Sequence, residues 1–124
     1  DGFRDTPQWY GRISKVIDHI HKHYGEELDI GSLAALAGIS QSQLERRFLQ
    51  LLGTSPGEYI LRVRVSASRA LLEATDRTIA DIALTVGFYD HSHFTRTFKR
   101  MMSCSPKAYR DHHRQQPTRR EPSA

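Results

Sequence analysis

Apolar residues recur along this chain at spacings of three and four, and no segment alternates apolar and polar residues over more than a few positions. The first stretch of this kind carries one apolar stripe, at Ile13, Val16, Ile17, Ile20 and Tyr24. Such spacings place side chains on one face of an α-helix. Thr6 and Pro7 form a typical helix start, and Gly25 can adopt the left-handed conformation that ends a helix. We therefore predict a helix from about residue 7 to residue 24.

Capping residues predict six more helices further along the chain. A polar N-cap residue stands before each of them: Asp29, Ser40, Ser55, Thr78, Asp90 and Ser105. Their side-chain oxygens can accept hydrogen bonds from the free amides of a first helical turn, and Ser40 with Gln43 forms a capping box. Glycines at positions 38, 53 and 87 are expected to end helices. The fold class is therefore all-α with seven helices, the last six at about residues 30–37, 41–52, 56–74, 79–86, 91–102 and 106–113.

The chain contains an internal repeat. The segment LAALAGISQSQLERRF matches IALTVGFYDHSHFTRTF, and each is followed by Ser-Pro and then a tyrosine. Gly38 corresponds to Gly87, 49 residues later, whereas Phe48 corresponds to Phe98, 50 residues later. Each copy consists of a short helix, a turn with glycine, and a second helix with a basic outer face. This pattern predicts two helix-turn-helix units; for a single copy, a helical hairpin without a nucleic-acid role would be an equal alternative.

Two histidines in the stretch HSHFTRTFKR, His91 and His93, raise the question of a metal or catalytic site. In the repeat they correspond to Gln41 and Gln43, which are polar residues at the start of a second helix. Residues two apart on a helix point about 200° away from each other, whereas metal-binding pairs are three or four apart. We therefore expect no metal and no cofactor, with a structural zinc as the less favoured alternative.

Composition restricts the class of function. The 124 residues suffice for one ordinary domain or two very small ones that share an element, and 18 Lys and Arg against 14 Asp and Glu favour a polyanionic partner. Cys104 is the single cysteine, so an internal disulfide is excluded, and no apolar run reaches the roughly 20 residues of a membrane span. We expect a soluble, cytoplasmic protein. The start DGFRDTPQWY does not resemble a signal peptide and is expected to be the cut end of a longer chain.

Three stretches together resemble the DNA-binding domain of the AraC/XylS family of bacterial transcription regulators: LAALAGISQSQLERRFLQLLGTSPGEYI, RALLEATDRTIADIALTVGFYDHSHFTRTFK and SPKAYR. The resemblance implies a bilobal domain over residues 7–113. Lobe one would span about 7–56, a long linker helix about 56–74 and lobe two about 78–113, with a recognition helix from each lobe in adjacent major-groove segments of double-stranded DNA. Residues 114–124 contain no large apolar residue and are expected to be a disordered tail.

The resemblance implies base-reading positions in both lobes. They are Gln41, Ser42, Glu45 and Arg46 in the first lobe and His91, Ser92, Thr95 and Arg96 in the second. Ser103 and Ser68 depart from the family, which usually has glycine and alanine there, and Ser103 suggests a looser helix stop. RNA polymerase is expected as a second partner, as for an activator, and the domain itself is expected to be monomeric.

Helical periodicity places the same positions on one face of each second helix. Around Ser42, the residues Glu45, Arg46 and Leu49 lie within about 60°. The opposite, core-facing positions are Leu44, Phe48 and Leu51 in the first copy and Phe94, Phe98 and Met101 in the second. In the second copy the outer face consists of Ser92, Thr95, Arg96 and Lys99.

Each polar or charged residue near these faces could either contact DNA or be part of the solvated surface. Arg46 and Arg96 can each bind guanine O6 and N7, and otherwise would be solvated or bound to phosphate. Glu45 could accept from cytosine N4, although restraint of Arg46 or Arg47 is the favoured role. The candidates for contacts to the DNA backbone are Gln43, Arg47, Arg62, His93, Lys99 and Arg100, with solvated surface as the alternative.

The sequence thus indicates a sequence-specific DNA-binding domain without catalytic activity. An enzyme alternative is a small hydrolase that uses His91 or His93, but no nucleophile or metal partner stands at a suitable spacing. An interaction alternative is a helical adaptor for another protein. The salt dependence of the affinity distinguishes the two kinds of binding. The affinity for DNA falls by orders of magnitude as the salt concentration rises, whereas the affinity of an apolar protein contact hardly changes.

Overall fold

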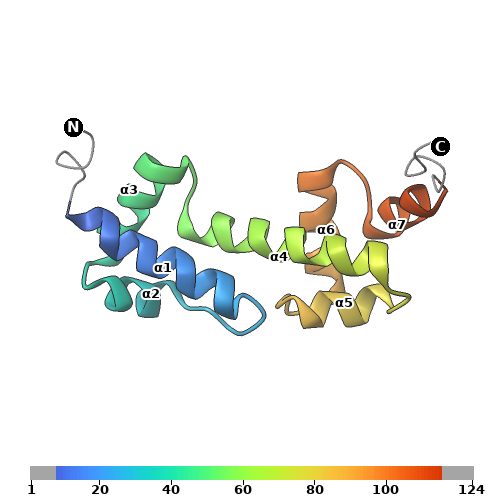
Figure 1. Cartoon of the computed structure of the whole chain (residues 1–124), viewed down its shortest axis with the longest axis horizontal. Helices are drawn as coiled ribbons and strands as arrows, with labels where there is room; N and C mark the ends of the chain where they lie inside the picture. The colour runs from blue at the N-terminus through green and yellow to red at the C-terminus, as the bar shows by residue number, and fades with distance from the viewer. Residues whose placement is uncertain (1–7, 116–124) are drawn as a thin grey trace, which may run out of the picture. The chain divides into compact units, whose positions relative to one another are not determined.

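The structure, a computed structural model, describes residues 8–115, and these form seven α-helices and no strand (Figure 1). The helices are α1 (Trp9–His23), α2 (Ile30–Ala37), α3 (Gln41–Leu52), α4 (Pro56–Ala74), α5 (Ile79–Thr85), α6 (His91–Met102) and α7 (Pro106–Arg114). The all-α prediction is confirmed, and every helix end lies within two residues of its predicted place.

The predicted N-caps form in the last six helices. Each capping side chain accepts a hydrogen bond from the backbone N–H three residues further on, and the capping box of Ser40 and Gln43 is complete. The start of α1 differs, because Gln8 stands at its N-cap without a side-chain cap bond, while Thr6 and Pro7 lie outside the described residues. The prediction for Gly25 is wrong, since Tyr24 ends α1 in a right-handed conformation and Gly25 does not take a positive φ.

The two turns between paired helices have the same hydrogen bonds. Gly38 and Gly87 both have positive φ, at 71° and 107°. The amide of Ile39 donates to the Ala34 carbonyl at 3.1 Å, and the amide of Phe88 donates to the Ala83 carbonyl, at the equivalent place, at 2.9 Å. These bonds satisfy carbonyl groups that a helix end leaves free. The repeat in the sequence is therefore also a repeat of backbone geometry.

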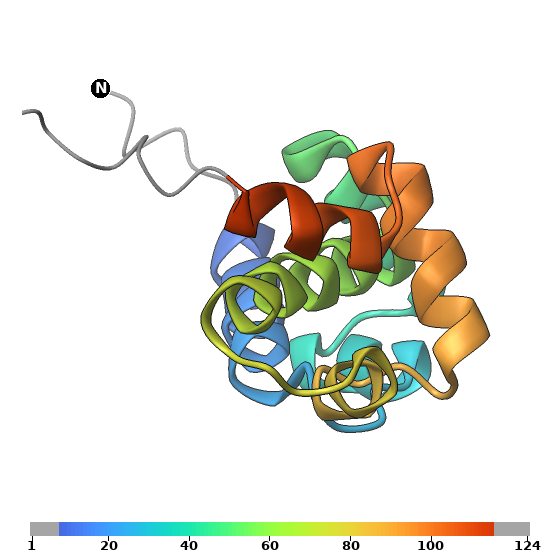
Figure 2. The ribbon, with the colours of Figure 1, turned by 90° about the vertical axis from the view of Figure 1, so that its right-hand side faces the viewer.

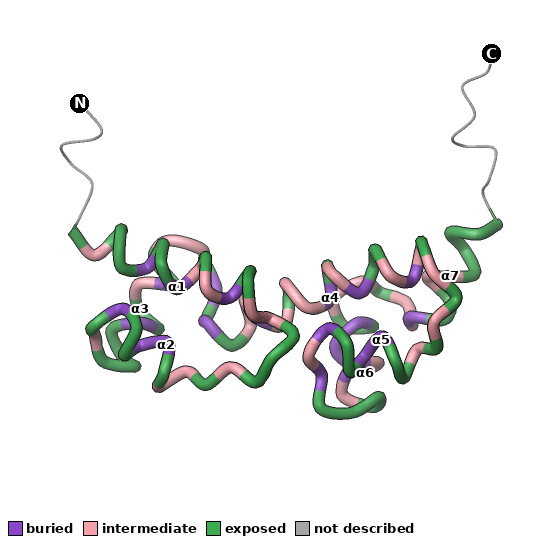
Figure 3. Tube along the Cα trace, turned by 60° about the horizontal axis from the view of Figure 1, so that its bottom comes forward, coloured by how far each residue is buried: buried purple, intermediate pink, exposed green. Residues whose placement is uncertain are grey.

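The contacts divide the chain into two units, with the boundary between Val63 and Arg64, inside α4. The core of unit 1 (described residues 8–63) is apolar and consists of Ile13, Val16, Ile20, Leu33, Ala34, Ala37, Leu44, Phe48 and Ile60. In unit 2 (described residues 64–115) the buried apolar side chains are Val65, Leu72, Ile82, Ala83, Val86, Phe88, Phe94 and Phe98. Figure 3 shows buried positions between exposed ones along the helices of both units. Each unit thus has its own core around a helix-turn-helix.

Helix α7 lies beside the C-terminal part of α4 in unit 2 (Figure 2). The Arg110 side chain donates to the carbonyls of Leu72 and Thr75, both at 3.1 Å. Arg114 also donates to the Thr75 carbonyl, at 2.7 Å, and forms an ion pair with Asp76 at 2.9 Å. Arg114, expected in the disordered tail, is instead the last residue of α7, and residues 116–124 lie outside the described part of the chain.

Helix α6 ends at a residue that carries a conformational cost. Ser103 has φ 65° and ψ 14°, and it is the non-glycine residue with positive φ among residues 8–115. Gly53 ends α3 with nearly the same angles, φ 70° and ψ 18°. The amide of each donates to a carbonyl four residues back, at 2.9 and 3.0 Å. The expectation of a looser stop is therefore wrong, because α6 ends with the same backbone angles and hydrogen bond as α3. The left-handed conformation nevertheless costs free energy at Ser103, because serine has a Cβ and glycine does not.

We predict that Ser103→Gly stabilises the chain by about 1 kcal/mol, because glycine adopts this conformation without the steric penalty of a Cβ. Gly53→Ser is the matched control and should destabilise by about the same amount, since a Cβ at Gly53 would meet no atom within 4 Å and only the conformational cost changes. Urea unfolding of both variants measures the two effects. Equal stabilities for Ser103→Gly and the wild-type chain would contradict the strain at this position.

Candidate nucleic-acid interface

The eight predicted base-reading residues all lie on the outer faces of α3 and α6. On α3 the side chains of Gln41, Ser42, Glu45 and Arg46 are exposed. On α6 the side chains of His91, Ser92 and Arg96 are exposed, whereas Thr95 is half-buried. The structure therefore brings each set of four together on one helix face within its own unit.

Buried side chains on the opposite faces hold these helices in place. Leu44 and Phe48 of α3 and Phe94 and Phe98 of α6 are fully buried, as predicted. Leu51 and Met101, also predicted for the core, are only half-buried because they lie in the last turn of their helices. The ring of Phe48 meets Tyr59 edge-on at 5.8 Å, and the ring of Phe98 meets Tyr109 edge-on at 5.6 Å. Apolar contacts thus fix which side of each helix faces outward.

Arg46 and Arg96 occupy equivalent places and have the same environment. Both side chains are exposed, and within residues 8–115 neither guanidinium forms a hydrogen bond, an ion pair or a ring contact. A guanidinium presents five N–H donors in a planar fork that can bind two acceptors at once. Both arginines therefore hold their donors available for a partner.

The prediction that Glu45 restrains a neighbouring arginine is wrong for the described residues. Glu45 makes no hydrogen bond or ion pair with Arg46 or Arg47 there. Arg47 instead donates to the Gln50 side chain at 3.1 Å and lies over the Trp9 ring, with 4.7 Å between the guanidinium carbon and the ring centroid. The cation–π contact draws Arg47 toward α1, so it is less available to a phosphate than its charge suggests.

The other predicted backbone contacts differ in how firmly they are held. Gln43 is exposed, but its carboxamide oxygen accepts from the Ser40 amide at 3.1 Å, which keeps the side chain at the helix start. His93 is half-buried, and its ring meets Phe88 edge-on at 5.2 Å. Arg62, Lys99 and Arg100 are exposed. Arg62 and Lys99, as exposed cations, are therefore better placed for contacts with a large anion than Gln43 or His93.

A cluster of polar side chains at the end of α4 serves the fold of unit 2. The Tyr109 hydroxyl donates to the Glu73 carboxylate and accepts from the Arg69 Nε at 3.3 Å. Burial, together with the Glu73 hydrogen bond, raises the pKa of Tyr109, so the hydroxyl keeps its proton as a donor. The equivalent Tyr59 in unit 1 makes a 2.7 Å hydrogen bond to His21. Arg69 on α4 therefore helps to hold Tyr109 of α7 in place.

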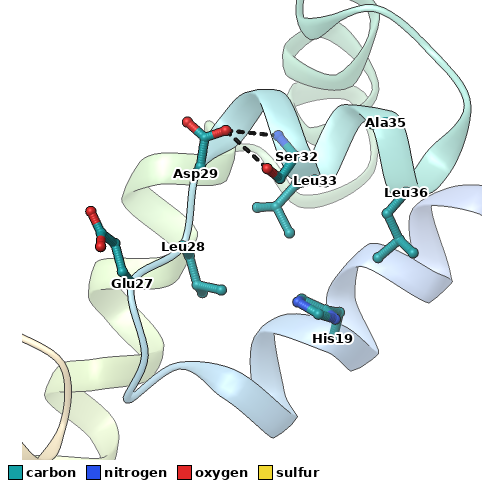
Figure 4. A pocket seen from close by; sticks show the side chains of 8 residues that line it. All are labelled: His19, Glu27, Leu28, Asp29, Ser32, Leu33, Ala35 and Leu36. Carbon is teal, nitrogen blue, oxygen red and sulfur yellow. Dashed lines mark hydrogen bonds between the residues drawn. The ribbon is translucent and has the colours of Figure 1, made fainter.

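An open pocket of about 440 Å³ lies between α1 and α2 in unit 1 (Figure 4). Its lining is mainly apolar and comprises His19, Glu27, Leu28, Asp29, Ser32, Leu33, Ala35 and Leu36. Asp29 is occupied as the N-cap of α2, accepting from the Ser32 amide at 2.9 Å and its hydroxyl at 3.1 Å. No predicted DNA-contacting residue lines this pocket, so it is separate from the reading faces.

The described residues contain no group of three or more His, Cys, Asp or Glu side chains that could hold a metal ion. Within the same residues, none of the helices combines the length and the apolar character needed to cross a membrane.

Comparison with known proteins identifies the family. A family model described as a helix-turn-helix domain matches residues 33–112, which is more than half of the chain and includes both copies of the repeat. The chain belongs to the AraC-type helix-turn-helix family. Members of this AraC-type family are DNA-binding regulators of transcription, as the sequence resemblance implied.

Curated relatives and solved structures agree with this AraC-type assignment. An uncharacterised HTH-type transcriptional regulator of Staphylococcus aureus (strain COL) is 35% identical over 99 residues, which are 80% of this chain and 13% of that protein. MtrA, an HTH-type transcriptional regulator of Neisseria gonorrhoeae, is 37% identical over 98 residues, which are 79% of this chain and 31% of MtrA. The chain thus spans less than a third of the length of these relatives.

Two solved structures cover nearly the whole AraC-type domain. One is a transcriptional regulator with an AraC-type DNA-binding domain from Chromobacterium violaceum, with a TM-score of 0.77, 30% identity, and coverage of 92% of this chain and 96% of that chain. The other is the DNA-binding domain of AdpA in complex with a target DNA, with a TM-score of 0.79, 29% identity, and coverage of 90% and 97%.

Proposed function

We propose that this chain binds specific sequences of double-stranded DNA and does so with the outer faces of α3 and α6, as the DNA-binding part of a longer transcription regulator. One observation carries the proposal: the two helix-turn-helix units present an exposed arginine without a partner at the same place, Arg46 on α3 and Arg96 on α6. In helix-turn-helix proteins the second helix enters the major groove. The neighbouring polar side chains are then positioned to read base edges.

The proposed base contacts follow from donor and acceptor chemistry. Arg46 and Arg96 each bind O6 and N7 of a guanine, the commonest specific base contact. Glu45, which has no arginine partner within the described residues, can accept from a cytosine N4 amino group. The remaining base-reading residues are Gln41, Ser42, His91, Ser92 and Thr95. The exposed Arg62, Lys99 and Arg100 contact phosphates, with smaller roles for Gln43, Arg47 and His93.

The wider role extends this proposal to the whole regulator. The AdpA domain of the same fold was solved with a target DNA, which supports DNA as the partner of this chain. We propose that the domain binds DNA as a monomer in the cytoplasm, that the parent regulator acts on RNA polymerase, and that no catalysis takes place. A single chain with two reading units needs no dimer partner to contact two groove segments.

We predict that the purified chain selects a DNA site from a random duplex library and protects two major-groove segments as a monomer. Its affinity should fall by orders of magnitude between 50 and 200 mM salt, because each neutralised phosphate releases counterions. Footprinting, sedimentation and a salt titration measure these properties. A footprint confined to one half-turn, or an affinity independent of salt, would contradict the proposal and favour a protein partner.

We predict that Arg46→Ala and Arg96→Ala each lose about 1–3 kcal/mol of binding free energy on the selected site and relax preference at different base positions. Lys15→Ala is the control, because it removes one exposed positive charge from α1 and changes neither α3 nor α6. Repeating the library selection with each variant gives the preference directly. An arginine variant that weakens all sequences equally would instead identify a phosphate contact.

We predict that the two histidines of α6 make different contributions to DNA binding. His91 is exposed in the first turn of α6, so His91→Ala should change base preference. His93 is half-buried against Phe88, so His93→Ala should mainly weaken binding. Library selection and affinity measurements, for wild type and both variants, measure these effects.

A chelator provides the control for the histidine experiment. Removal of metal ions should leave the affinity of the wild-type chain unchanged, since imidazoles two residues apart on α6 point away from each other. Stoichiometric zinc that is required for DNA binding would overturn the assignment of His91 and His93 to DNA.

A further inference from the structure

The turn of unit 2 contains one residue more than the turn of unit 1. In unit 1, one residue, Ile39, separates Gly38 from the N-cap Ser40. In unit 2, two residues, Phe88 and Tyr89, separate Gly87 from the N-cap Asp90. Phe88 makes the same backbone bond as Ile39 and is buried. Asp90 caps α6 as Ser40 caps α3. The additional residue is therefore Tyr89, and sequence analysis overlooked it although the repeat shifts from 49 to 50 residues at this point.

Tyr89 contributes little to the stability of the folded chain. Its side chain is 90% exposed. Among the tyrosines of residues 8–115, it alone makes no hydrogen bond, ring contact or electrostatic interaction. Tyr59 and Tyr109, by contrast, each make a hydrogen bond and pack edge-on against a buried phenylalanine. Single exposed aromatic residues are common on protein surfaces, so the location of Tyr89 has to supply the argument for a role.

The location of Tyr89 is next to the reading face of α6. It lies directly before the N-cap Asp90, and the next two residues, His91 and Ser92, are exposed. In a helix-turn-helix the first helix crosses the DNA backbone and the start of the second enters the major groove. The turn between them then runs along the edge of that groove, where sugars and phosphates lie. Tyrosine is one of the side chains that proteins use for hydrogen bonds to phosphate oxygens.

We infer that Tyr89 is a further DNA-contacting residue, whose ring packs on a deoxyribose and whose hydroxyl donates to a phosphate oxygen at the edge of the groove entered by α6. The inference rests on the proposed function of the reading faces. It gives unit 2 a backbone contact that unit 1 lacks, because the shorter turn of unit 1 has no residue at this place. Tyr89 then helps to fix the register of α6 on its DNA segment.

Substitution of single phosphates by neutral methylphosphonates tests the contact on a duplex selected by the wild-type chain. At one phosphate in the segment read by α6, the substitution should weaken the wild-type chain about threefold to tenfold, the equivalent of one hydrogen bond. Tyr89→Phe should lose a similar factor on the unmodified duplex and show no further loss at that phosphate. Tyr89→Ala should lose more, because the ring contact disappears as well.

Tyr10→Phe is the matched control, since it removes the hydroxyl of an exposed tyrosine on α1 and should bind like the wild-type chain. If no phosphate position couples to Tyr89→Phe while Arg96→Ala still loses affinity, the inference about Tyr89 is overturned and the proposed function stands. If Tyr89→Ala binds DNA normally but fails in transcription with RNA polymerase, Tyr89 faces a protein and the inference is likewise overturned. Absence of DNA binding by the wild-type chain would overturn both.

Discussion

Burial of Phe48 and Phe98 determines what the rest of the molecule can present to a partner. Successive residues on a helix are about 100° apart, so a helix whose phenylalanine is fixed in a core has no freedom to rotate about its axis. Because Phe48 is buried, Arg46 points outward on α3. Because Phe98 is buried, Arg96 points outward on α6. Rotation by one residue would bury a charged or polar group without a partner, which costs several kcal/mol. The outer faces are thus a consequence of the cores.

The helix ends complete this constraint. A Ser or Asp N-cap begins α3 and α6, and a left-handed residue, glycine or Ser103, ends them. The same kinds of backbone hydrogen bond recur at both sites, so each second helix has a defined first and last residue as well as a defined rotation. A base-reading side chain needs both defined helix ends and a defined rotation. A shift by one residue would move the side chain about 1.5 Å along the helix axis and turn it by about 100°.

The sequence was sufficient for features that depend on neighbouring residues. Helix boundaries from Asp29 onward followed from caps and glycines, and the exposure of the base-reading positions followed from the period of the apolar residues. The errors at Gly25 and Ser103 concern the local conformation of a helix end, whereas others concern contacts between residues far apart in the chain. Arg47 stacks on Trp9, and Arg114 is drawn into α7 by the Thr75 carbonyl.

Local sequence patterns carry no information about such partners. The charge of an arginine is visible in the sequence, but whether its donors are already occupied depends on tertiary packing. For this reason Arg47, Arg69 and Arg110 differ from Arg46 and Arg96, although all five are arginines on helices of the same domain. Tyr89 was overlooked for a different reason, since a single inserted residue does not disturb the apolar period on either side of it.

The division of the chain inside α4 has a consequence for how the protein unfolds. Ile60 belongs to the core of unit 1 and Val65 is buried in unit 2, yet both lie on one uninterrupted helix. Starting a helix is costly and extending it is not, so the unit that folds first supplies a helical nucleus from which the other unit can continue. Two small cores, each marginal for its size, thereby share one nucleation event, and loss of either core frays a helix on which the other depends.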